Sequence, residues 1–443
     1  MEDGGARDSN ICRTAGFSAY RIDNDRCPSL SEVTAMDLFN DAFRCDPYHE
    51  YAQLRAESPI HRVNGPMGLE MWLVTRYEDV RAALNEPRLS KSPHNAPQWM
   101  RDLGLVTEDE GRVGQNMLAS DPPDHTRLRK LVTKAFTRRR MESLRPRIQQ
   151  ITDEMIDAMS EKDEVDLIDG LAFPLPITVI CELLGVPTAD RYSFRIWTRA
   201  LTAPSLTGEG LRALRRARAD ISKYLTDLIA YRRAHAEPSF SIDDQPDLVS
   251  ALIIAVDEQD RLSDQELLGT LQLLLVAGHE TTVNLIGNGM VALLRHPEQR
   301  ALLHAEPELL PGAVEELLRY DGPVERTTPR YAIEDITLSG TTIPAGSVVS
   351  VALASANRDS ERTPNPDALD ITRSTHDNVA FGHGIHHCLG AQLARIEGEV
   401  AIGTLLRRFP ALGLACPAEE LRWKYGTAVD IFRGLESLPV RLI

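Results

Sequence analysis

The amino-acid sequence predicts a mainly helical protein with a minor β-sheet. The segment from His125 to about Leu309 has helical hydrophobic periodicity almost throughout, and a second long helix is predicted over Leu389–Phe409. The strand-like runs are short and lie outside these segments. The chain has 443 residues, a hydrophobic content of 42%, and no dividing linker or internal repeat. We therefore expect one domain over residues 46–443, after a loosely ordered lead-in over residues 1–45.

The predicted elements before His125 alternate between helix and strand. They are a helix over Asp46–Glu57, strands over Ile60–Val63 and Met71–Thr75, and a helix over Tyr77–Leu84. The stretch Glu86–Ser120 contains prolines and glycines and has little periodicity. Because long irregular loops inside a domain are usually functional or disordered, this stretch is a candidate binding loop.

A capping box predicts the start of the most informative helix. Ser263 is followed three residues later by Glu266, so the helix begins near Asp264, and Pro297 ends it. About 32 residues at roughly 1.5 Å each give a rod of roughly 48 Å. The part over Leu267–Val276 is apolar on nearly all faces, which predicts that this helix crosses the interior.

The pattern changes to short paired strands after this helical segment. The runs are Ile336–Leu338, Thr341–Ile343 and Val348–Leu353, and the first two are separated by a Ser-Gly turn. A loop-rich stretch from Asn357 to Gly384 follows, and the Leu389–Phe409 helix precedes a β-like tail.

Charge and cysteine usage exclude several classes of protein. A formal net charge of −16 argues against a nucleic-acid binder and against a protein that rests on an anionic membrane. The sequence has neither a membrane-spanning apolar run nor the layout of a signal peptide, so a cytoplasmic protein is expected. The six cysteines form no C-x-x-C pair, which excludes ribbon-type zinc sites and thioredoxin chemistry.

The strongest local motif is the loop Phe381–Gly390. Glycines at 382 and 384 allow a tight hairpin, and Cys388 then lies at the start of a helix. The helix dipole is expected to lower the pKa of the thiol from about 8.5, and such a thiolate binds soft or borderline metals. Phe381 is placed to shield the sulfur from water. Two alternatives stay open here: a merely buried cysteine, or a zinc site made with the nearby histidines His383, His386 and His387.

A second motif, Ala277–Thr282, lies in the middle of the interior helix. A glycine, an acid and two hydroxyls are unusual in a buried helix, and a hydroxyl that bonds to the i−4 carbonyl can open the helix to water. Burial is expected to raise the pKa of Glu280 and to make it a proton donor. The alternative is a structural kink with a satisfied carboxylate. A third motif is the pair Glu316 and Arg319, which is weak evidence by itself.

Taken together, the three motifs resemble those of the bacterial cytochromes P450, and the resemblance extends from about Asp46 to the C-terminus. It implies a triangular, mainly helical prism with haem b between the long helix and the Cys388 loop, Cys388 being the iron ligand. The zinc alternative then becomes negligible. The resemblance assigns the haem carboxylates to His125, Arg129, Arg330 and His386. The other residues that it places at the haem are Ala277, Phe381, Gly382 and Gly390. The sequence departs from the family at Pro366–Leu369, where an arginine and an aromatic usually bond to the Glu316–Arg319 pair; Arg373 is a possible substitute.

The resemblance also implies a reaction and its partners. The enzyme is expected to be a monomeric monooxygenase that uses O₂, with Glu280 and Thr281 supplying protons while Cys388 donates electron density. Electrons are expected from a ferredoxin and its NAD(P)H-dependent reductase. Six cations near the haem-anchoring helix predict the docking patch for an acidic ferredoxin, although a solvated helix face is the simpler alternative. These cations are Arg127, Lys130, Lys134, Arg138, Arg139 and Arg140.

The predicted substrate is a bulky secondary metabolite. Thr178–Pro187 and Ala277–Leu285 resemble actinobacterial enzymes that hydroxylate or epoxidise macrolides and other polyketides. The candidate substrate contacts are Val276, Ala277, Val324 and Ile431, which predict an aliphatic pocket. The acidic run Glu108–Glu110 is a candidate partner for a cationic sugar, or a solvated loop tip. A steroid, terpenoid, peptide or xenobiotic substrate is the alternative, and a non-oxygenating sensor or partner protein is a remote one.

Overall fold

The structure is a computed structural model, and its residues from Ala35 to Ile443 form one compact unit. It describes residues 36–37, 43, 45–64, 70–102, 106, 116–202, 208–235, 239–254, 262–374, 377–424 and 431–442. The compact unit starts ahead of Asp46, because a short strand, Met36–Asp37, pairs in parallel with Val63 and Asn64. In the part of the chain that the structure describes, no helix is long and apolar enough to span a membrane.

Most of the compact unit is helical, which confirms the predicted class. The helices before the long interior helix are α2 Tyr48–Glu57, α3 Tyr77–Asn85, α4 Gln98–Asp102, α6 Asp124–Ala135, α7 Arg138–Ser143, α8 Arg145–Met159, α9 Pro174–Leu184, α10 Arg191–Thr202, α11 Gly208–Ala234 and α12 Leu248–Ile254. The later helices are α13 Asp264–Arg295, α14 Pro297–Ala305, α15 Leu310–Asp321, α16 Leu353–Asn357 and α17 Ala391–Arg408.

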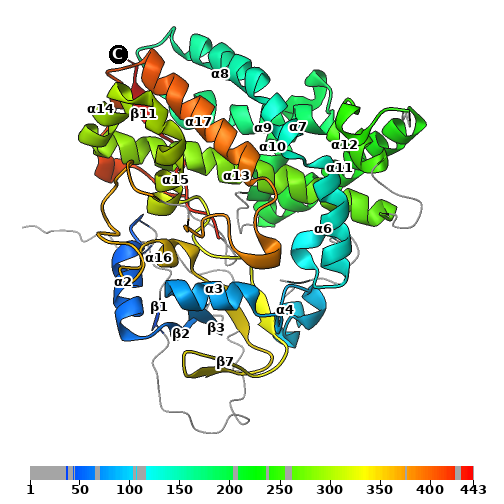
Figure 1. The fold of residues 1–443 in the computed structure, drawn as a ribbon. Helices are drawn as coiled ribbons and strands as arrows, with labels where there is room; N and C mark the ends of the chain where they lie inside the picture. Colours follow the sequence, from blue (N-terminus) through cyan, green and yellow to red (C-terminus); the bar gives the residue numbers. More distant parts are fainter. Residues whose placement is uncertain are drawn as a thin grey trace, which may run out of the picture. The chain divides into compact units, whose positions relative to one another are not determined.

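The strands form one larger sheet and two small ones. The six-stranded sheet has the order β1-β2-β3-β9-β6-β4 and lies on the side of the unit opposite α8 and α9 (Figure 1). Its strands are β1 Met36–Asp37, β2 Ile60–Asn64, β3 Glu70–Val74, β4 Leu89–Ser90, β6 Arg330–Ala332 and β9 Val348–Val351. The strands β7 Ile336–Leu338 and β8 Thr341–Ile343 form the predicted hairpin, whereas β9 joins the large sheet instead of that hairpin.

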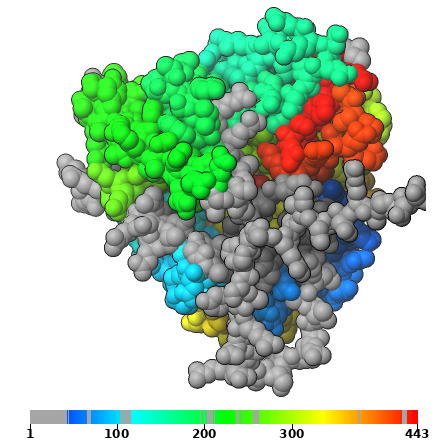
Figure 2. Space-filling view, turned by 180° about the vertical axis from the view of Figure 1, so that it is seen from behind, coloured from blue at the N-terminus to red at the C-terminus, as the bar shows by residue number. Residues whose placement is uncertain are grey.

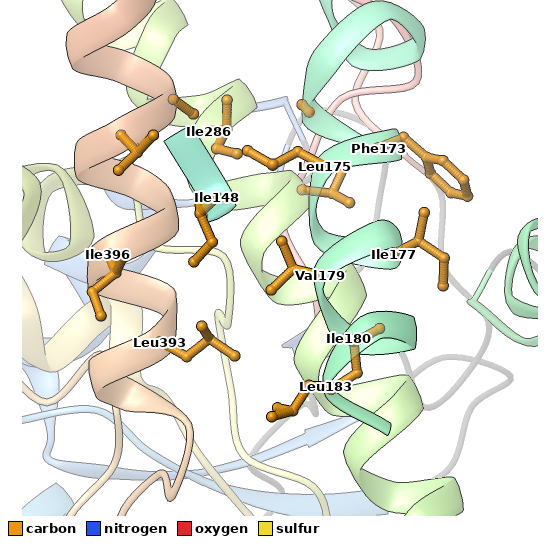
Figure 3. Close-up of a cluster of buried hydrophobic side chains, with 14 of the residues drawn as sticks. Ile148, Phe173, Leu175, Ile177, Val179, Ile180, Leu183, Ile286, Leu393 and Ile396 are labelled. Carbon is orange, nitrogen blue, oxygen red and sulfur yellow. The ribbon is translucent and has the colours of Figure 1, made fainter. Parts of the chain in front are cut away.

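The helix α13 has the predicted capping box and crosses the interior. The Ser263 hydroxyl accepts from the Glu266 amide at 3.2 Å, and the Glu266 carboxylate accepts from the Ser263 amide at 2.7 Å. In Figure 3, side chains of α9 and α17 pack on either side of α13, with Ile286 of α13 between them. Removal of this continuous apolar surface from water holds the helical part together.

The C-terminal segment packs back onto the helices. Its last strand, β11 Pro439–Arg441, lies between β5 Glu164–Asp166 and β10 Gly413–Leu414. Figure 2 shows this segment, in red, at the surface next to the teal helical segment. The tail thereby reaches α13, which it meets through Lys424, Arg433 and Gly434.

Candidate functional site

The middle of α13 carries accessible surface on one narrow face. Ala277 is exposed and Thr281 is half-buried, although their neighbours His279, Glu280 and Thr282 are buried. The Thr281 hydroxyl donates to the Ala277 carbonyl at 2.8 Å, as predicted, and the helix continues without a break. A core helix with an exposed alanine and an accessible hydroxyl has room beside it for a ligand.

Small and neutral groups let the rest of this motif pack. A Cβ at Gly278 would lie 3.3 Å from Ile180, so the glycine permits close contact with α9. The ring of His279 packs edge-on against Phe173, with 4.5 Å between centroids. Burial lowers the pKa of His279 to about 4, so this histidine is a neutral core residue at neutral pH.

Glu280 is buried at 3% exposure but is not an isolated acid. Its carboxylate lies 2.5 Å from the ammonium of Lys424, which also lies 3.4 Å from the Asn284 side-chain oxygen. Lys424 was not among the predicted site residues. No local pattern signals it, because Glu280 and Lys424 are 144 residues apart in the chain.

A second buried acid, Glu397 of α17, faces the same motif. Burial raises the pKa of Glu397 to about 8, and a hydrogen bond with Thr282 offsets part of that shift. One of its carboxyl oxygens has no hydrogen-bond partner among the described residues. The sequence analysis missed this residue too, although an acid among the apolar positions of the last long helix was a usable signal.

The Cys388 loop forms the predicted hairpin. Gly382 and Gly384 both have a φ of +72°, which L side chains rarely adopt. The Cys388 amide donates to the Phe381 carbonyl at 2.9 Å and closes the turn. The helix that follows begins at Ala391 rather than Leu389.

The predicted direction of the Cys388 pKa shift is wrong for the polypeptide by itself. Burial raises the pKa of the thiol more than the Gly390 amide and the guanidinium groups of Arg129 and Arg395 lower it. The residue Cys388 as a whole is nevertheless exposed. A metal that binds the thiol would displace its proton and offset the effect of burial on its pKa.

The histidines of this loop do not converge on a zinc site. In the described ranges, which include all of 381–390, no three His, Cys, Asp or Glu side chains are placed to share a metal ion. In the same loop, the phenyl ring of Phe381 packs against Arg395, whose guanidinium lies 4.5 Å from the ring centroid.

The predicted haem-carboxylate residues do come together. The ring centroids of His125 and His386 lie 4.4 Å apart, although 261 positions separate the two residues in the sequence. Burial and neighbouring positive groups lower the pKa of His386 to about 3. The neighbours that contribute are His125, Arg330, Lys91 and Arg129.

This cationic cluster has too little negative charge of its own. Burial lowers the pKa of Arg330 to about 10 and holds that of Lys91 well below its usual value, with Asp121 as the offsetting carboxylate. Within the part of the chain that the structure describes, the buried Arg330 Nε has no hydrogen-bond partner. Buried basic groups that repel one another fit an anionic ligand, such as the haem carboxylates that the sequence predicts here. Lys91 was missed because it lies in the aperiodic stretch after α3.

The Glu316–Arg319 pair is buried and has a third member. Arg319 donates to the two Glu316 oxygens at 2.7 and 2.8 Å. Arg373 approaches Glu316 at 3.3 Å and therefore fills the place that the sequence left in doubt. Arg319 also donates to the carbonyls of Pro366 and Ala368, so the pair anchors the loop before the Cys388 hairpin.

Two of the candidate substrate contacts meet at a junction with the tail. Val324 forms an isolated bridge with Phe432, and the Ile431 carbonyl accepts from the Glu325 amide at 2.8 Å. Val276 is half-buried on α13. The acidic run Glu108–Glu110 lies outside the described residues.

The basic stretch is only partly a surface patch. Lys130, Arg138 and Arg139 are exposed and Lys134 is half-buried. Arg127 is paired with Glu266, at the start of α13. Arg140 was wrongly included, because it is buried and donates to backbone carbonyls at positions 242 and 245, at 3.1 and 2.9 Å.

Comparison with known proteins gives consistent matches along nearly the whole chain. The family model "Cytochrome P450" matches residues 44–184 and 190–412. Cytochrome P450 monooxygenase PikC of Streptomyces venezuelae is 50% identical over 92% of this chain and 94% of its own. Vitamin D(3) 25-hydroxylase of Pseudonocardia autotrophica is 47% identical, over 92% of this chain and 96% of its own.

Two further matches carry informative names. Mycinamicin IV hydroxylase/epoxidase of Micromonospora griseorubida is 44% identical, over 91% of this chain and 97% of its own. The solved structure of the bacillaene polyketide synthase cytochrome P450 PksS of Bacillus subtilis is 40% identical, with a TM-score of 0.82, over 92% of this chain and 99% of that one. The chain therefore belongs to the cytochrome P450 family of haem-thiolate monooxygenases.

Proposed function

We propose that this monooxygenase hydroxylates or epoxidises a macrolide or another polyketide, with Cys388 as the thiolate ligand of the haem iron. The observation that carries the site assignment is the unbalanced basic cluster beside the exposed residue Cys388. His125, Arg129, Arg330 and His386 would hold the haem carboxylates as hydrogen-bond donors, and Lys91 adds a further basic side chain. The haem supplies the activation of O₂.

The polypeptide's part in the reaction is the control of protons on the other face. The Thr281 hydroxyl is accessible at the surface of α13 and is placed to hold a hydrogen bond to the reacting oxygen. Glu280, one residue earlier, is placed to relay protons from the tail side. Reduction of O₂ with insertion of one atom consumes two protons and two electrons. The relay must therefore deliver protons while bulk water stays excluded from the site.

The electron donor in this proposal is a ferredoxin with an NAD(P)H-dependent reductase. The exposed cations Lys130, Arg138 and Arg139 lie just after the haem-anchoring residues of α6. Their charge is opposite to the net charge of −16, which favours steering of an acidic partner to this side.

The substrate class rests on the relatives and on the chemistry of the accessible residues. PksS and the mycinamicin IV hydroxylase/epoxidase carry names of this class, whereas the vitamin D(3) 25-hydroxylase supports a steroid-like alternative at a similar identity. Val276, Ala277 and Val324 are small aliphatic side chains, which suit a bulky apolar ligand.

Optical titration separates these two classes. The ferric protein is titrated with mycinamicin IV and with vitamin D₃, and the low-to-high-spin change is measured. The proposal is supported if the spin-state change occurs at lower concentrations of mycinamicin IV than of vitamin D₃ and mycinamicin IV is converted to an oxygenated product. Turnover of vitamin D₃ alone would replace the polyketide assignment with the steroid-like one.

A further inference from the structure

The tail residue Lys424 stands beside the proposed proton relay. Its ammonium lies 2.5 Å from the Glu280 carboxylate, which belongs to the turn of α13 that carries Thr281. The Lys424 side chain is 25% exposed and that of Glu280 is 4% exposed. The pair therefore connects a buried acid at the reaction site to the surface of the tail.

The tail is built to hold Lys424 in this place. The Lys424 amide donates to the Gly434 carbonyl at 2.8 Å, and Trp423 bridges Leu435, so the two arms of the tail are paired. Gly434 touches the Asn284 side chain, and any Cβ there would overlap it. One turn further along α13, Asn288 donates to the Arg433 carbonyl at 3.0 Å.

Arg433 fixes the same arm from its other side. Its guanidinium donates to Asp321 at 2.6 Å and lies 3.7 Å from the Trp423 ring centroid. The Glu280–Lys424 pair therefore does not depend on one flexible side chain. It is the result of a tail that is attached to both α13 and the end of α15.

Stability alone is a weak reason for such a pair. Burial of two charges costs free energy that their attraction only partly returns, and apolar residues of similar volume usually stabilise a core as well or better. The other titratable groups near Glu280 do not need the lysine. His279 has a pKa of about 4, and Glu397 of α17 hydrogen-bonds with Thr282.

We propose that Lys424 is a positioning residue for the proton relay. Its ammonium holds the Glu280 carboxylate toward the tail, so that a proton taken up on the tail side passes to the carboxylate and then toward Thr281. This inference rests on the proposed role of Glu280. Removal of the cation takes away this partner of the buried carboxyl and frees it to adopt other rotamers.

The test compares four single variants of the haem-loaded enzyme. Lys424→Met removes the cation, Lys424→Arg restores one, and Glu280→Gln removes the acid. Arg422→Met is the matched control, because Arg422 is an exposed cation of the same tail segment. A surrogate ferredoxin, its reductase and NADPH supply electrons, with no organic substrate present.

The readout is the fate of O₂. Two electrons and two protons convert O₂ to hydrogen peroxide, whereas four of each convert it to two molecules of water. Lys424→Met and Glu280→Gln should each raise the peroxide share on the order of twofold or more. Lys424→Arg and Arg422→Met should stay near the wild-type ratio. The solvent deuterium isotope effect on NADPH consumption should also rise in Lys424→Met.

A second readout does not depend on turnover. The melting temperatures of wild type, Lys424→Met, Glu280→Gln and the double variant form a cycle. The double variant should recover much of the loss seen in Lys424→Met, because it no longer buries an unpaired acid. If Lys424→Met does not fold, Lys424→Gln takes its place in both measurements.

Each contrary outcome has a distinct meaning. If Glu280→Gln raises the peroxide share but Lys424→Met and Lys424→Gln do not, the positioning role is wrong and the proposed relay stands. If Glu280→Gln has no effect, the proposed relay itself is wrong. If Arg422→Met raises the peroxide share as much as Lys424→Met does, the effect reflects a general loss of positive charge, and the inference is overturned.

Discussion

The two faces of the candidate haem site are charged in opposite ways. Around Cys388, the basic side chains Arg330 and Lys91 crowd the imidazole of His386, with Asp121 as the offsetting carboxylate. On α13, the buried Glu280 has a cation of its own, Lys424. The first face therefore requires negative charge from a ligand, whereas the charge of the Glu280 carboxylate is balanced by Lys424 within the chain. The difference supports the proposal that one face binds the cofactor and the other controls the delivery of protons.

Replacement of Arg330 should break the first half of this comparison most strongly. Arg330→Met removes a buried, charge-assisted donor worth about 1.5–3 kcal/mol, so haem affinity should fall roughly 10- to 150-fold. The haem-free protein should become more stable, because repulsion within the cluster decreases. Haem titration and urea unfolding of the haem-free chain measure the two effects. Destabilisation of the haem-free variant would contradict the idea of an unbalanced cluster.

Replacement of Thr281 tests the second face without changing its charge. Thr281→Ala should keep haem and substrate binding but divert electrons to hydrogen peroxide, with product per NADPH falling roughly tenfold. The Thr281 hydroxyl already donates to the Ala277 carbonyl, so loss of the helix is not expected. The matched control is Thr282→Val, whose hydroxyl bonds to Glu397 instead. Unchanged coupling in Thr281→Ala would remove this residue from the relay.

Glu397 sharpens the comparison because, among the described residues, burial and Thr282 but no cation shift its pKa. Its pKa is raised from 4.5 to about 8, so the stability that it contributes is present below pH 4.5 and is lost as the pH rises through about 8. Glu397→Gln should remove this loss, which amounts to up to a few kcal/mol. Urea unfolding across this pH window measures it. Glu399→Gln, on the same helix, is the control, and equal slopes in wild type and Glu397→Gln would refute the assignment.

Charge reversal on α6 and α7 should have the smallest effect. Lys130→Glu with Arg139→Glu should slow reduction by ferredoxin several-fold at low salt and less at high salt, because exposed charges are screened. Lys223→Glu on α11 is the control, since this lysine is also exposed. Stopped-flow reduction at two ionic strengths gives the answer, and a salt-independent rate would exclude this docking patch.

Local sequence patterns predicted the parts of the site that depend on neighbours in the chain. The capping box at Ser263 and the glycine hairpin before Cys388 are present as expected. Each needs only a few consecutive residues, so the sequence contains all the information for it.

Long-range partners could not be predicted in this way. Lys91 and Lys424 acquire their roles from segments far away in the chain, and the tertiary fold alone brings them together. The same holds for the Cys388 pKa, whose sign depends on how much protein surrounds the sulfur. Arg140 was placed on the surface from a charge run, but its position in α7 turns it inward.

The most direct test of the haem-thiolate assignment is the ferrous–CO spectrum of the purified enzyme and of Cys388→Ser. Wild type should show the strongly red-shifted Soret band of thiolate ligation, and Cys388→Ser should lose that band while Arg330 and the rest of the cationic cluster still retain haem. A red-shifted band that survives in Cys388→Ser would contradict the assignment of Cys388 as the iron ligand.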